Sequence, residues 1–79
     1  MRLDLYLKQI GVLKRRSLSK ETIEKNRVRV NDQITKPSYE VKPQDIIDIY
    51  FKEHSIKIRV LNPIQNYETI PQPKPIPSK

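Results

Sequence analysis

The residues best suited to chemistry in this sequence form one short basic run. Directly before Ser17 stand three cations, Lys14, Arg15 and Arg16. Serine is a preferred residue at a helix N-cap, so we expect a helix to begin at Ser17 with its free backbone N–H groups beside these cations. Side-chain charge and backbone N–H groups would then converge on one place, which is the chemistry of a phosphate site. Taken alone, such a run is more often a solvated charge cluster.

No other residues combine into a catalytic or metal-binding set. Ser17 has no partner base, because the single histidine, His54, falls in a distant turn beside Glu53. His54 also lacks a second ligand at metal-binding spacing. Asp45 and Asp48 could form a carboxylate pair, but one lies in an expected turn and the other on the outer face of an expected strand. Surface solubility accounts for both, so we expect no catalytic residue, no metal and no cofactor.

Length and charge narrow the class of protein. The chain has 79 residues, which is room for one domain and too little for an enzyme of ordinary size. It has no cysteine, so disulfides and thiolate chemistry are excluded. The net charge is +7, and residues 1–42 carry +6 of it, with eleven basic against five acidic residues. This concentration of cations suggests a polyanionic partner, and nucleic acid is favoured over an anionic membrane surface.

Two helices are expected, one on each side of the basic run. The second runs from Ser17 to about Lys25, with Leu18 and Ile23 on its inner side, and ends where Asn26 can adopt a positive φ. The first ends at the only glycine, Gly11. Its apolar side chains form one stripe with the i, i+3, i+4, i+7 spacing of a helix face: Leu3, Tyr6, Leu7 and Ile10.

After Asn26 the apolar period changes from 3.6 to 2, which predicts strands. One hairpin joins 27–31 to 33–35, with Val28, Val30 and Ile34 facing inward. A second hairpin joins 47–51 to 56–60. Beyond residue 61 the pattern is lost, and five of the seven prolines follow. We therefore expect an α+β domain over residues 1–61 and a flexible proline-rich tail over 62–79.

Five motifs in one order carry a resemblance to a known family. They are RLD-x-YL at 2–7, KRRS at 14–17, V-x-VN at 28–31, KPS at 36–38 and VKP-x-D at 41–45. Together they resemble the S-four RNA-binding domain, which is named for small-subunit ribosomal protein four. Within that family the chain is similar to the branch containing RqcP-type ribosome quality-control factors and heat-shock protein fifteen. At three positions where the family usually has glycine, the chain has Asn26, Asp32 and Gln44.

The resemblance implies two N-terminal helices on a small antiparallel sheet, the alpha-L motif, gripping structured RNA. A-form RNA hides its base edges, so proteins bind its phosphates and 2′-hydroxyls, a task for cations at fixed separations. Arg2 and Lys8 could reach a second RNA backbone such as tRNA. The matching contact positions are Arg2, Arg15, Arg16, Ser17 and Lys20, with Lys14 adjacent. The other nearby cations that we count as candidates are Lys8, Arg29 and Lys36.

Three functions are compatible with the sequence. The first is a stand-alone, monomeric, cytoplasmic factor that binds rRNA, and tRNA as a further partner, on the large ribosomal subunit in quality control of stalled peptidyl-tRNA. The second is an RNA-targeting module of an RNA-modifying enzyme, which is less favoured because the chain starts with Met1 and has no catalytic segment. The third is a protein-interaction module that uses the proline-rich tail.

Overall fold

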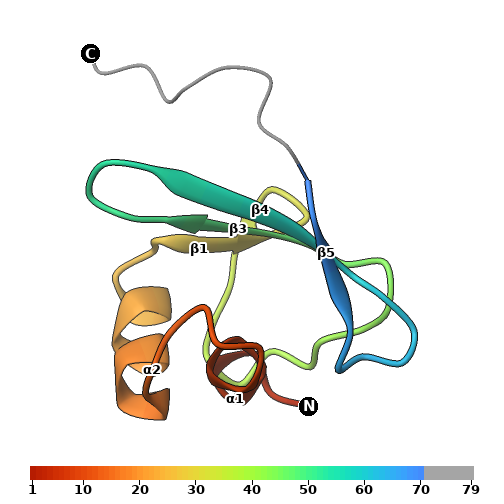
Figure 1. The fold of residues 1–79 in the computed structure, drawn as a ribbon. Helices are drawn as coiled ribbons and strands as arrows, with labels where there is room; N and C mark the ends of the chain where they lie inside the picture. Colours follow the sequence, from red (N-terminus) through yellow and green to blue (C-terminus); the bar gives the residue numbers. More distant parts are fainter. Residues whose placement is uncertain (71–79) are drawn as a thin grey trace.

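The computed structural model describes residues 1–70, which fold into two helices and five strands. The strands form one antiparallel sheet in the order β2-β1-β3-β4-β5, and both helices lie on one side of it (Figure 1). This arrangement confirms the expected α+β fold. The elements are α1 (Leu3–Gln9), α2 (Arg16–Glu24), β1 (Val28–Val30), β2 (Gln33–Ile34), β3 (Ile46–Tyr50), β4 (Ser55–Val60) and β5 (Tyr67–Thr69).

The helices follow the predicted periodicity in α1 and depart from it in α2. The inner face of α1 is fully buried, and the helix stops before Gly11, whose φ is +85°. In α2 the expected inner residue Leu18 is 40% exposed, and Ser19 is buried in its place. Ser19 and Ile23 are separated by one helical turn, so they share a face, whereas Leu18 lies about 100° away. The prediction for Leu18 was therefore wrong.

The central strands show the predicted alternation. Val28 and Val30 pair with Ile49 and Ile47, and all four side chains are buried on the helix side. The turn residues Asn31 and Asp32 both have positive φ. Ile34 does not face inward as expected: it stands opposite Arg29 in the ladder and is 56% exposed. Opposed residues in an antiparallel pair share a face, so Ile34 belongs to the outer face of the sheet.

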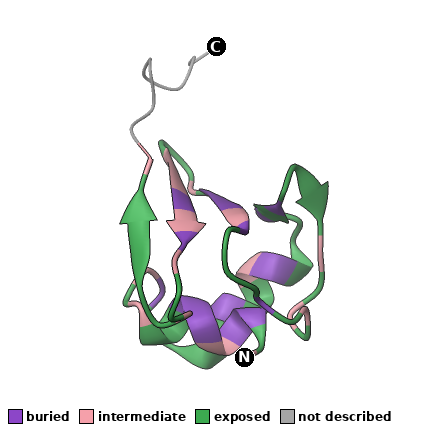
Figure 2. Cartoon of the chain, turned by 90° about the vertical axis from the view of Figure 1, so that its right-hand side faces the viewer, coloured by how far each residue is buried: buried purple, intermediate pink, exposed green. Residues whose placement is uncertain are grey.

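A fifth strand lies in the region expected to be a tail. β5 pairs with β4 through Ile58↔Thr69 and Val60↔Tyr67, so regular structure extends past residue 61. All three residues of β5 are exposed, and Figure 2 shows it as an exposed edge of the sheet. An exposed three-residue strand has no apolar alternation, which is why the periodicity did not predict it. The remaining tail residues, 71–79, lie outside the described part of the chain.

The hydrophobic core lies between the sheet and the helices. Figure 2 shows buried segments on both helices and on the central strands. Within residues 1–70, no helix has the length and hydropathy needed to cross a membrane. The core side chains come from every element except the two edge strands: Leu3, Tyr6, Leu7, Leu13, Ile23, Val28, Val30, Val41, Ile47, Ile49, Ile58 and Val60.

Two aspartates expected at the surface are buried. Asp45 accepts hydrogen bonds from the Tyr39 hydroxyl (2.8 Å), the Lys42 backbone N–H (2.9 Å) and the Asn31 side-chain amide (3.2 Å). Asp48 lies on the outer face of the sheet, 3.8 Å from the Lys57 ammonium, and burial raises the pKa of its carboxyl. Surface solubility therefore does not account for either residue. Asp45 instead holds the loop of residues 39–42 by hydrogen bonds.

Gln44 occupies a backbone conformation that disfavours its side chain. Its φ is +76°, and its N–H donates to the Val60 carbonyl at 2.8 Å, so the turn is fixed by the sheet. A non-glycine residue with positive φ costs about 1 kcal/mol or more. We expect Gln44→Gly to raise the free energy of unfolding by about 1 kcal/mol. Urea denaturation would measure the change, and an unchanged or lower stability would contradict it.

Candidate functional site

One buried carboxylate joins the beginnings of the two helices. Asp4 is in the first turn of α1, and its side chain is only 2% exposed. Its Oδ2 atom lies 3.2 Å from Nη2 of Arg2 and 3.6 Å from Nε of Arg16. Both arginine side chains remain about half exposed, at 47% and 51%. Asp4 therefore fixes two guanidinium groups side by side while leaving their outer edges open to a ligand.

The start of α1 is held by a loop that is distant in sequence. The backbone N–H of Leu3 donates to the Tyr39 carbonyl at 2.8 Å, and that of Asp4 donates to the Pro37 carbonyl at 3.2 Å. Arg2 also forms an isolated bridge with Glu40. These bonds occupy the N–H groups that begin α1, so the binding capacity of this corner comes from side chains.

The basic run lies beside this pair. Lys14 and Arg15 are exposed in the connection between the helices, and Arg15 is the N-cap residue of α2. α2 begins at Arg16, one residue earlier than predicted, and no side chain caps it. Ser17 is therefore inside the helix, and the prediction that it caps the helix was wrong. The backbone of Arg15 is extended, with φ of −134° and ψ of 148°, so the first helical residue is Arg16.

The other candidate cations fall into two groups. Lys20 is exposed one turn beyond Arg16, and Lys8 is exposed in the last turn of α1. Lys36 follows β2, next to Pro37, whose carbonyl holds α1. Arg29 is separate from them, because Val28 and Val30 face the helices and Arg29 points to the outer face, with its guanidinium 5.6 Å from the centre of the Tyr50 ring. The structure thus brings Arg2 and Arg16 together through Asp4, and it places Arg29 on the opposite face of the sheet.

The sequence interpretation missed the central residue of the site. It gave Asp4 no part in the site, and it placed Arg2, together with Lys8, on a second RNA backbone apart from Arg16. In the structure both arginines contact the same oxygen atom of Asp4. The opposite charges of Arg2 and Asp4 were the available signal. Arg2 is the extended N-cap residue of α1, so its side chain can reach Asp4 in the first turn. The contact of Arg16 with Asp4 arises only from the packing of α2 on α1.

The Tyr39 hydroxyl gives the loop beside this site a pH dependence. Burial, together with the hydrogen bond to Asp45 and its charge, raises the pKa of Tyr39 to about 12. The unfolded chain has a tyrosine pKa near 10, so the folded state retains the proton over a range in which the unfolded state loses it. We expect the titration of Tyr39 to leave the free energy of unfolding unchanged below about pH 10 and to lower it from pH 10 to 12.

A comparison with Tyr39→Phe tests this expectation. Tyr6, whose pKa burial also raises to about 12, contributes in the same direction, so the variant should show a smaller slope and not a flat line. Denaturant unfolding between pH 9 and 12 would give both slopes. Identical slopes for the two proteins would contradict the role of Tyr39.

Within residues 1–70, no three His, Cys, Asp or Glu side chains are grouped as a metal ion requires. His54 instead stacks on Phe51, with ring centroids 4.7 Å apart. What the described part of the chain does offer is two half-exposed guanidinium groups at fixed positions, which is chemistry suited to holding an anionic backbone.

A family model, curated proteins and a solved structure all resemble this chain. The model of the S4 domain family matches residues 1–47. A protein named RQC P-site tRNA stabilizing factor from Streptococcus pneumoniae is 39% identical over 61 residues, covering 77% of this chain and 69% of that protein. The protein of the same name from Bacillus subtilis is 37% identical over 60 residues, covering 76% and 70%. The solved trimeric structure of Vibrio cholerae Heat Shock Protein 15 has a TM-score of 0.80 at 25% identity, covering 89% of this chain and 81% of that one.

Proposed function

Because this chain belongs to the S4 domain family, we propose that it is an RNA-binding factor whose contact surface is built around Arg2, Asp4 and Arg16. The observation that carries the proposal is the shared carboxylate, which holds two half-exposed guanidinium groups next to each other. An arginine offers a planar fork of donors that matches a phosphate group. Two such forks at a fixed separation fit successive phosphates of a structured RNA backbone.

The surrounding cations extend this surface along the helices. Lys14 and Arg15 precede Arg16, and Lys20 follows it by one turn, so they can contact neighbouring phosphates of the same RNA. Lys8 lies at the far end of α1, where a second RNA backbone could be reached. On this proposal Arg2 acts together with Arg16 on the first backbone. Ser17 contributes its position near the start of α2 and no cap.

The relatives suggest the setting. They are named for stabilizing a P-site tRNA in ribosome-associated quality control, at 37–39% identity over most of this chain. We propose the same role here: one copy of the chain binds rRNA on the large ribosomal subunit in the cytoplasm and steadies an obstructed peptidyl-tRNA. The function is positioning, which requires cations at fixed places and no catalytic group.

Sedimentation of the tagged protein from cells tests this role. We expect it to co-migrate with large subunits and to increase there when stalled peptidyl-tRNA accumulates, whereas an Arg16→Ala variant should move toward the top of the gradient. If the unmodified protein co-migrates with small subunits, or sediments as free protein, the assignment to quality control fails. RNA binding in solution would be judged separately, by the measurement described in the Discussion.

A further inference from the structure

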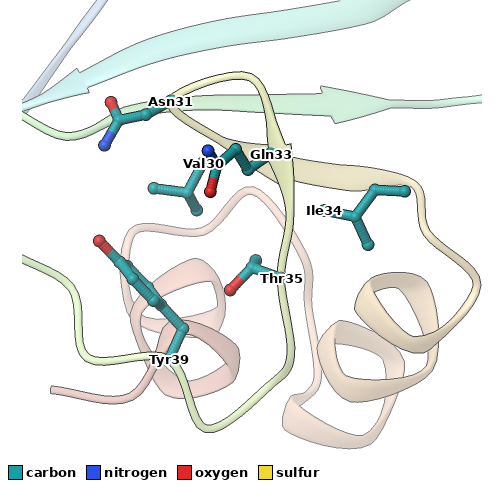
Figure 3. A pocket seen from close by; sticks show the side chains of 6 residues that line it. All are labelled: Val30, Asn31, Gln33, Ile34, Thr35 and Tyr39. Atoms are coloured by element: carbon teal, nitrogen blue, oxygen red, sulfur yellow. The ribbon is translucent and has the colours of Figure 1, made fainter.

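A hollow of about 350 Å³ lies between the β1–β2 hairpin and the loop that leads to Tyr39 (Figure 3). Val30 and Gln33 border it from the hairpin, and Thr35 extends toward Tyr39 from the loop. We call it the hairpin pocket. The residues that line it are Val30, Asn31, Gln33, Ile34, Thr35 and Tyr39.

None of the lining side chains is an acid or a base that is charged at neutral pH. Asn31 and the Tyr39 hydroxyl are already used, since Asn31 bonds Asp45 and the Ile46 N–H, and Tyr39 bonds Asp45. The Gln33 amide and the Thr35 hydroxyl take no part in these bonds, so in the described chain they are free to serve a ligand. Val30 supplies an apolar wall and Tyr39 an aromatic ring. This lining suits a flat, neutral group with hydrogen-bonding edges.

The pocket is adjacent to the cationic surface without being part of it. The ammonium of Lys42 lies 5.0 Å from the centre of the Tyr39 ring, so one cation lies next to a wall of the pocket, and Lys36 directly follows Thr35 in the chain. The same loop is bonded to the start of α1, next to the Arg2–Asp4–Arg16 group. A ligand whose phosphates are held by these cations could therefore place an uncharged portion in the pocket.

We propose that the hairpin pocket binds one unpaired nucleobase of the RNA, read by Gln33 and Thr35. The inference rests on the proposed RNA-binding function and adds to it the class of RNA that is preferred. Proteins recognise RNA sequence mainly at unpaired nucleotides, whose bases lie out of the helix against aromatic side chains and are hydrogen-bonded on their edges. The pocket volume is at the small end of ligand sites, about 300–1,000 Å³, which suits a single base.

The test uses RNA hairpins that differ in one nucleotide of the stem. In the first set a single bulged nucleotide is A, C, G or U; in the second the same bulge is an abasic ribose, which keeps the phosphates and removes the base. We expect the protein to bind its preferred bulge about tenfold more tightly than the abasic RNA, the size expected for one or two hydrogen bonds. Gln33→Ala and Thr35→Val should reduce this ratio to below about threefold. Gln65→Ala, an exposed glutamine in the β4–β5 loop, is the matched control and should leave the ratio unchanged.

A second measurement follows the pocket directly. The side-chain amide NMR signal of Gln33 should shift on adding the preferred bulged RNA and stay in place with the abasic RNA. If the wild-type protein binds bulges with and without a base equally tightly, the proposal that the pocket binds a base is wrong. It is also wrong if Gln33→Ala lowers the affinity for both RNAs by the same factor. In either case Arg16-dependent binding would leave the proposed function standing. If no RNA binds, both proposals fail.

Discussion

Replacing Arg16 by alanine is expected to weaken binding of structured RNA by about ten- to a hundredfold. A hydrogen bond from a charged donor contributes about 1.5–3 kcal/mol, and each 1.4 kcal/mol is a factor of ten in affinity. Arg16 is also the residue that brings α2 to the carboxylate of Asp4, so its loss leaves Arg2 without a fixed neighbour. Lys20→Ala should change affinity in the same direction and by less, because its ammonium has no such partner in the described chain.

Affinities over a salt series distinguish a lost phosphate contact from a general loss of charge. Removal of one contact should lower the magnitude of the log–log salt slope by about 0.7 to 0.9. Lys25→Ala is the matched control, because it removes one positive charge from an exposed position just beyond α2, where Lys25 pairs with Glu21 at 3.0 Å. Circular dichroism should show both variants folded. An unchanged slope for Arg16→Ala would place the RNA site elsewhere on the domain.

Asp45→Ala should be the most destabilising substitution outside the core, lowering the free energy of unfolding by about 3 kcal/mol or more. The variant would leave the Tyr39 hydroxyl, the Lys42 N–H and the Asn31 amide without their shared acceptor. A part-buried donor that loses its partner costs about 1–3 kcal/mol. The total stability of a domain of this size is of the order of 5–10 kcal/mol, so the variant loses a large share of it.

Two further variants make this expectation specific. Asp45→Asn retains one acceptor oxygen and should lose about half as much. Glu53→Ala changes an exposed acidic residue in the β3–β4 turn and should stay within about 0.5 kcal/mol of the parent protein. Urea unfolding measures all three. Equal stability of Asp45→Ala and Glu53→Ala would show that the Asp45 hydrogen bonds contribute nothing net.

Apolar periodicity predicted the fold correctly where one face of an element is buried and the other is exposed to solvent. The stripe of α1 and the alternation in β1, β3 and β4 were read correctly, because burial on one face enforces a single period. The same reasoning failed at Ser19, where the small side chain lies on the inner face of α2 and the larger Leu18 is left exposed. It also gave the wrong face for Ile34 in β2 and did not predict β5. Both are edge strands, which bury no side chain.

The candidate site was predicted in part, for a related reason. The basic run at 14–16 predicts a cluster of cations, but no local sequence pattern predicts which carboxylate will pair with them. The Asp4–Arg16 contact depends on how α2 packs on α1, and the bonds from Tyr39 and Pro37 to α1 cross more than thirty residues of sequence. The positive φ at Asn26, Asp32 and Gln44 was foreseeable, since the resemblance placed these residues where glycine is usual. The role of Asp45 was not, because a turn aspartate gives no sign of its burial.

The bonds that hold the start of α1 also decide when the proposed RNA-binding surface can form. α1 has seven residues, fewer than an isolated helix needs to be stable in water. Its first N–H groups depend on Pro37 and Tyr39, Tyr39 depends on Asp45, and the Asp45 carbonyl is bonded by the N–H of Val60. A peptide of residues 1–26 should therefore be neither helical nor able to bind RNA. On the proposed function, a chain under synthesis would become competent to bind RNA only after Val60 has left the ribosomal exit tunnel, so a partly made copy would not compete with finished ones.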